Sequence, residues 1–69
     1  MTDAYAVCRY VRHYLTKNGY APSRGMCGCS VEFVDQLAAN GVVEVLSLYE
    51  GGPPIKVVLT EKGQRMAAR

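Results

Sequence analysis

Residues 30–60 constrain the fold more than any other part of the chain. The segment begins with SVEFVDQLAANG, in which apolar residues recur three and four positions apart and therefore share one face of a helix: Val31, Val34, Leu37 and Ala38. Gly41 follows, and glycine tolerates the left-handed conformation that ends many helices. The sequence therefore predicts one helix from Ser30 to Asn40.

Two β-rich runs come next, VVEVLSLY at residues 42–49 and IKVVL at residues 55–59. The loop between them, EGGPP, holds glycines that supply positive φ angles and prolines that stop a strand, so the runs are expected to pair as a hairpin. Thr60 then stands where the N-cap of a short helix, EKGQRMAAR, belongs. Helix, hairpin and short helix in this order predict an α+β domain.

The N-terminal segment predicts a long helix that Thr2 or Asp3 caps and Gly19 closes. Its apolar residues gather on the face expected to be buried: Ala4, Val7, Cys8, Val11, Tyr14 and Leu15. The opposite side is basic, with Tyr5 and Tyr10 near its edges, and such a face either contacts phosphates or is simply solvated. Its polar residues are Arg9, Arg12, His13, Thr16 and Lys17.

Two short motifs carry a resemblance to a known family. NGYAPS (residues 18–23) follows the first helix, and LTEKG (residues 59–63) follows the hairpin. With these motifs in this order, nearly the whole chain resembles small bacterial and phage winged helix-turn-helix regulators. The resemblance implies a single winged-helix domain over residues 1–69: helix, short helix, helix, two-stranded wing and short C-terminal helix. It also implies that residues 30–40 form the recognition helix and residues 50–54 the tip of the wing.

The chain departs from that family between its first and third helices. Ser23 can cap a second helix, but only RGMCGC (residues 24–29) is available to form it. Each of its two glycines opposes helix formation by about 1 kcal/mol relative to alanine. We therefore expect a single turn, anchored by Met26.

Charge is distributed unevenly, and two kinds of partner remain open. The local charge is +3 over residues 1–24, −4 over residues 25–50 and +3 over residues 51–69. The leading interpretation is a DNA-binding transcriptional regulator of phage or mobile-element type. Its contacts would come from cations that meet phosphates and carboxamides that pair with adenine: Arg9, Arg12, Lys17, Arg24, Lys56, Gln36 and Asn40.

The alternative is a winged-helix module that binds a protein. The predicted recognition helix exposes Glu32, Phe33 and Asp35 but no cation, and this face suits a protein surface better than a groove lined by phosphates. Such a module would act as a phage-encoded inhibitor of a host protein, for instance a regulator, a polymerase or a defence complex such as CRISPR.

In the first β-rich run the apolar residues do not all fall on one face of the strand. Val43 and Val45 share one face, whereas Leu46 and Leu48 share the other. A bulge would let one apolar face continue. Without a bulge, Leu46, Leu48 and Val58 form an exposed patch. We favour the patch, and it predicts a homodimer with the hairpin at or near the two-fold axis.

The cysteines, the histidine and the N-terminal segment argue against a metal site, an enzyme and a membrane protein. Cys27 and Cys29 have C-x-C spacing, whereas zinc prefers wider pairs, and Cys8 and His13 lie on different sides of their helix. No metal, cofactor or enzymatic activity is therefore predicted, because the single histidine has no fixed neighbour and no phosphate loop follows a strand. Without a signal peptide or a long apolar run, a cytoplasmic protein without a membrane partner is expected.

Overall fold

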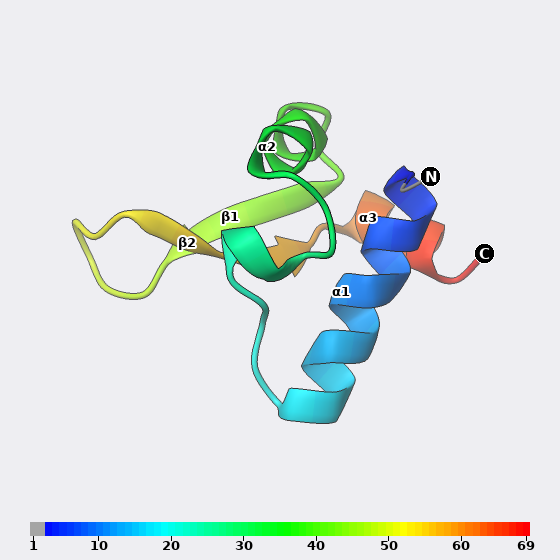
Figure 1. Cartoon of the computed structure of the whole chain (residues 1–69), viewed down its shortest axis with the longest axis horizontal. Helices are drawn as coiled ribbons and strands as arrows, with labels where there is room; N and C mark the ends of the chain where they lie inside the picture. The colour runs from blue at the N-terminus through cyan, green and yellow to red at the C-terminus, as the bar shows by residue number, and fades with distance from the viewer. Residues whose placement is uncertain (1–2) are drawn as a thin grey trace.

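The computed structural model describes residues 3–69 (Figure 1). Along the chain, two strands follow the first helices and precede the last one. The elements in chain order are α1 (Ala4–Asn18), the single 3₁₀ turn η1 (Arg24–Met26), α2 (Val31–Ala39), β1 (Val43–Ser47), β2 (Pro54–Leu59) and α3 (Glu61–Ala67). The hairpin extends to one side of the helices. The predicted α+β layout is therefore confirmed, and it is consistent with a winged helix.

Helix α1 begins and ends where the sequence predicts. The Asp3 carboxylate accepts a hydrogen bond from the backbone N–H of Ala6 at 2.7 Å, and Gly19 adopts φ 77° after the last turn. Thr2, the other candidate cap, lies outside the described residues. Val7, Cys8 and Val11 are buried as expected.

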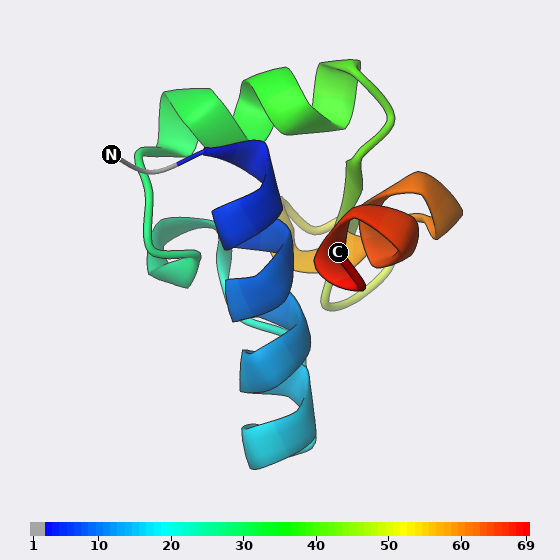
Figure 2. The ribbon, with the colours of Figure 1, turned by 90° about the vertical axis from the view of Figure 1, so that its right-hand side faces the viewer.

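Leu15, in contrast, is 48% exposed, so its assignment to the buried face was wrong. The C-terminal end of α1 projects beyond the other helices, which leaves little to cover this side chain (Figure 2).

The second helix is reduced to the single turn expected from its glycines, but its anchor differs from the prediction. Met26 is 53% exposed, whereas Cys27 is fully buried. The Cys27 Sγ donates to the carbonyl oxygen of Ser23 at 3.4 Å. A three-residue turn points the following residue, rather than its own last one, into the core, and this explains the shift from Met26 to Cys27.

Helix α2 is capped by Ser30, whose Oγ accepts from the backbone N–H of Phe33 at 3.2 Å. Val34 and Leu37 are buried, while Val31 is 36% exposed at the first turn. Phe33 was expected to be exposed, but it is half-buried and packs against the core.

The strands β1 and β2 pair with Val43 opposite Leu59 and Val45 opposite Val57. The register shifts between Leu46 and Ser47, so one extra residue of β2, Ile55, is accommodated as a bulge. Strand β1 ends at Ser47, two residues before the end predicted for its run.

Helix α3 is held against the hairpin by Thr60 and Gly63. The Thr60 Oγ1 accepts from the Gly63 N–H at 3.2 Å, and its hydroxyl lies 2.5 Å from the Gly41 carbonyl oxygen and 2.9 Å from that of Val42. A side chain at Gly63 would collide with the Val42 backbone, so glycine permits this close approach.

The core lies where α1, α2, the hairpin and α3 meet. Its members are mostly small and branched side chains: Val7, Cys8, Val11, Cys27, Val34, Leu37, Val42, Val43, Val57 and Ala67. Within residues 3–69, no helix is both long enough and apolar enough to cross a membrane.

Candidate interaction surfaces

Two surfaces on different sides of the fold hold most of the residues that the sequence selects, whereas Phe33, Lys56 and Val58 belong to neither. The wing surface is the name we give to the exposed and partly exposed polar, aromatic and leucine residues that η1, α2 and the hairpin contribute: Arg24, Glu32, Asp35, Gln36, Asn40, Glu44, Leu46, Leu48, Tyr49 and Glu50. The basic surface is the outer side of α1, with Arg9, Arg12, His13 and Lys17. Figure 1 shows α2 and the hairpin on one side and α1, next to α3, on the other.

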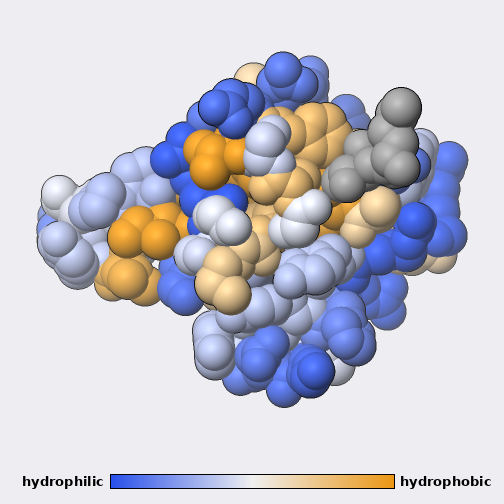
Figure 3. Space-filling view, viewed as in Figure 1, coloured by the Kyte–Doolittle hydropathy of each residue, from blue (hydrophilic) through white to orange (hydrophobic). Residues whose placement is uncertain are grey.

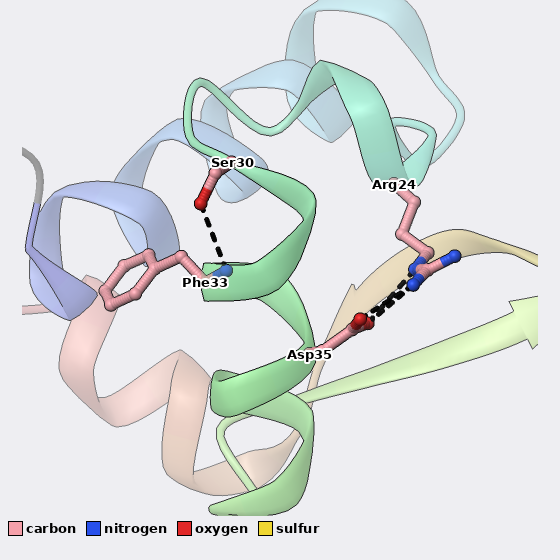
Figure 4. A network of polar contacts seen from close by, with 4 residues as sticks. All are labelled: Arg24, Ser30, Phe33 and Asp35. Atoms are coloured by element: carbon pink, nitrogen blue, oxygen red, sulfur yellow. Dashed lines mark hydrogen bonds and ion pairs between the residues drawn. The ribbon is translucent and has the colours of Figure 1, made fainter.

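An ion pair on the wing surface joins two residues that the sequence assigns to opposing functions. The Arg24 guanidinium donates to Asp35, with Nη2 at 2.7 Å from Oδ2 and 2.9 Å from Oδ1, and Nε at 3.1 Å from Oδ1 (Figure 4). These hydrogen bonds raise the pKa of Arg24. Arg24, predicted to bind DNA, and Asp35, predicted to bind protein, therefore satisfy each other.

Lys56 is also engaged within the molecule. Its Nζ donates to the carbonyl oxygen of Ala21 at 3.1 Å and lies 5.1 Å from the centroid of the Tyr20 ring. The side chain thus reaches toward the loop after α1, rather than toward the tip of the wing. The charged residues that the hairpin leaves exposed are Glu44 and Glu50.

The two candidate base-reading residues on α2 are exposed but only partly available. The Asn40 carboxamide donates to the backbone carbonyl of Gln36 at 2.8 Å and so caps the end of the helix. Glu32 is exposed on the same helix.

Phe33 points toward α1 and α3, away from Asp35, so it does not share a surface with the ion pair (Figure 4). It is therefore a poor anchor for a protein partner.

The hairpin exposes a cluster of apolar side chains. Leu46 is 41% exposed, Leu48 is 60% exposed and Tyr49 is 65% exposed. Figure 3 shows apolar surface on the hairpin, next to hydrophilic surface. The extra residue of the bulge, Ile55, belongs to β2 and not to the first run, where alternation breaks at Val45 and Leu46. The bulge therefore does not continue one apolar face, and Leu46 and Leu48 stay exposed, as the alternative without a bulge predicts.

Two details of this cluster differ from expectation. Val58 is half-buried and lines a groove beside α1, so it is a weaker member than predicted. Tyr49 was not selected from the sequence, although an aromatic residue directly before a Gly/Pro loop is a recognisable signal. Its ring lies over Gly52, where an added Cβ would come within 2.8 Å of the ring atoms.

The basic surface keeps its charges free. Within residues 3–69 the ion pairs are Arg24–Asp35 and Arg65–Glu61, so Arg9, Arg12 and Lys17 have no carboxylate at ion-pair distance. Tyr10 and Tyr14 lie beside them with ring centroids 6.3 Å apart. This combination of free cations and tyrosines is compatible with phosphate contacts.

The thiols lie in surroundings that keep them protonated. Burial raises the pKa of Cys27 to about 11, and burial also raises the pKa of Cys8 and of Cys29. In the described part of the chain no three His, Cys, Asp or Glu side chains are grouped as metal ligands would be. These cysteines behave as small apolar side chains.

Comparison of the chain with protein-family models, with curated proteins and with solved structures gives no match. The resemblance to winged helix-turn-helix regulators therefore stays a prediction beyond the layout of the fold.

Proposed function

We propose that the chain is a winged-helix module that binds another protein through its wing surface. One observation carries this proposal. Both cations expected next to a DNA groove, Arg24 and Lys56, are engaged within the molecule, while the same side exposes Leu46, Leu48 and Tyr49. Exposed leucine beside tyrosine is typical of a protein interface.

Electrostatics support the same choice. With Arg24 bound to Asp35, the wing surface keeps the charges of Glu32, Glu44 and Glu50. A phosphate backbone would be repelled by these carboxylates, because non-specific affinity for DNA comes mainly from lysine and arginine. The partner is therefore a protein with an apolar depression that receives Leu48 and Tyr49, rimmed by lysine or arginine. A host protein inhibited by a phage-encoded module is one such partner.

The test is site-specific photocrosslinking at two exposed tyrosines. A benzophenone amino acid replaces Tyr49 on the wing surface or, as a matched control, Tyr5 on α1, which is 37% exposed. We expect a discrete protein adduct in cell lysate from position 49 and none of the same mass from position 5. Leu48→Glu, combined with the probe at position 49, should remove the adduct. Equal adducts at both positions would contradict the proposal.

DNA binding through the basic surface is the second candidate. It is supported by Arg9, Arg12 and Lys17, which lack carboxylate partners within residues 3–69. This candidate uses α1 rather than α2, so Gln36 and Asn40 would not read bases. Duplex titrations at two salt concentrations test it, because phosphate contacts make affinity fall steeply with salt. Weak binding without salt dependence would exclude it.

A further inference from the structure

A groove lies between α1 and β2, and Val58 in its wall is paired with Glu44 across the hairpin. Its volume is about 500 Å³, within the range of roughly 300 to 1,000 Å³ that is typical of ligand pockets. Leu15, Val58 and Leu59 contribute apolar walls, and Arg12 and Gln64 contribute polar groups at the margin. For a domain of 69 residues this is a large cavity.

The groove runs along an edge of β2 that is only partly paired. Strand β1 covers the other edge. On the groove side, the Val57 N–H donates to the Pro22 carbonyl oxygen at 3.0 Å, and Ser23 forms an isolated bridge with Lys56. Alternate residues of a strand direct their backbone groups to opposite edges, so the N–H of Leu59 points to the same edge as that of Val57. Among residues 3–69 no strand covers this end of β2.

The side chains at the groove define the chemistry of an occupant. Leu15 is 48% exposed, although it belongs to the apolar face of α1, and it lines the groove with half-buried Val58. Arg12 is exposed and lies outside both ion pairs found in the described part of the chain. An aliphatic side chain would cover Leu15 and Val58, and a carboxylate would compensate the charge of Arg12.

We infer that this groove binds an extended peptide segment, which adds as a strand to the outer edge of β2. One aliphatic side chain of the segment packs between Leu15 and Val58, and a neighbouring carboxylate binds Arg12. Strand addition explains the combination of a partly unpaired strand edge at Leu59 with an apolar groove, because main-chain hydrogen bonds give affinity and alternate side chains give specificity. The inference goes beyond the proposed function, since Leu46, Leu48 and Tyr49 are not among the residues that line the groove.

The probe for this inference is the peptide acetyl-Asp-Val-Thr-Val-Thr-Asp-amide, which carries a carboxylate at each end for either strand direction. Its control has the same side chains but N-methyl groups on both valines, so it cannot donate the strand hydrogen bonds. Titration of the ¹⁵N-labelled full chain should shift the amide resonances of Val57 and Leu59 in a saturable manner. The N-methylated peptide should bind about tenfold more weakly, since it lacks the donors of these main-chain hydrogen bonds.

Variants separate this groove from the wing surface. Arg12→Gln should weaken binding about fivefold, and a probe with asparagine in place of aspartate should lose affinity for the unmodified chain but not for the variant. Leu15→Lys, at an exposed position that the fold tolerates, should weaken binding further, while Leu48→Glu should leave it unchanged. The absence of saturable shifts at millimolar peptide would overturn the inference, as would equal binding of the N-methylated probe or shifts centred on Leu48.

Discussion

On the α1 side of the molecule Arg9, Arg12 and Lys17 reach solvent without a carboxylate at ion-pair distance within residues 3–69. On the α2 and hairpin side Arg24 binds Asp35, and Lys56 binds the carbonyl oxygen of Ala21. Both sides carry cations, but only the first offers them to a partner. The charge of a sequence segment is therefore a poor guide to the charge that a surface presents.

Alkaline pH should have the largest effect, because it acts on the residue that supports the turn carrying Arg24. Burial raises the pKa of Cys27 from its ordinary value of 9.0 to about 11, so the unfolded chain loses this proton first. The contribution of the protonated Cys27 thiol to the free energy of unfolding is fully present below pH 9, and it is lost as the pH rises toward 11. The expected loss is about 2 kcal/mol in the free energy of unfolding.

Urea unfolding at pH 8 and at pH 10.5 measures this loss. In Cys27→Ala the difference between the two pH values should shrink, although burial of Cys8 leaves some of it. A difference as large as in the unmodified chain would show that another group titrates.

DNA binding at the wing surface would contradict the conclusion that only the α1 side offers free cations. We expect Arg9→Gln/Arg12→Gln to reduce any affinity for duplex DNA about thirtyfold, since each charge near a phosphate is worth about 1 kcal/mol in water before screening. Arg24→Gln/Lys56→Gln removes the same number of cations from the other side and is the matched control. Fluorescence anisotropy at low salt measures both. A larger loss in the control pair would place DNA on the wing surface.

Self-association would be a second difference between the two sides, because the sequence predicts that the homodimer forms through the apolar hairpin. Leu48→Glu should raise the dimer dissociation constant at least about tenfold, since the two-fold axis presents the substituted residue twice. The variant should remain folded because Leu48 is 60% exposed. Light scattering over a concentration series measures the change. If the unmodified chain is a monomer even at high concentration, the predicted homodimer is wrong.

The smallest effect is expected for the ion pair itself. Arg24 and Asp35 are partly exposed, with side-chain exposures of 36% and 53%, so Arg24→Gln should lower the melting temperature only slightly. Its loss should instead make the wing surface more negative. Thermal unfolding measures the first effect, and the salt dependence of partner binding measures the second.

Local signals made much of the fold predictable. Asp3 and Thr60 occupy the predicted cap positions, and their side chains accept the expected hydrogen bonds. Ser23 precedes η1 as predicted, but its side chain makes no capping hydrogen bond, so that part of the prediction was wrong. Gly19 and Gly41 adopt positive φ angles after their helices. These features depend on a few neighbouring residues, so the sequence alone determines them.

The interaction surfaces were harder to predict because they depend on residues distant in sequence. Asp35 lies eleven positions from its partner Arg24, and Lys56 reaches the carbonyl oxygen of Ala21, thirty-five positions away. The exposure of Leu15 depends on how far α1 projects past β2, which helical periodicity does not encode.

The contact between Tyr49 and Gly52 has a consequence for binding. The ring lies so close to the glycine that any larger residue would displace it, and the Gly52 N–H also donates to the Tyr49 carbonyl oxygen at 3.0 Å. An exposed aromatic side chain restrained in this way has lost part of its rotational freedom before a partner arrives. Under the proposed function, the entropy cost of docking this ring on a partner would be correspondingly smaller.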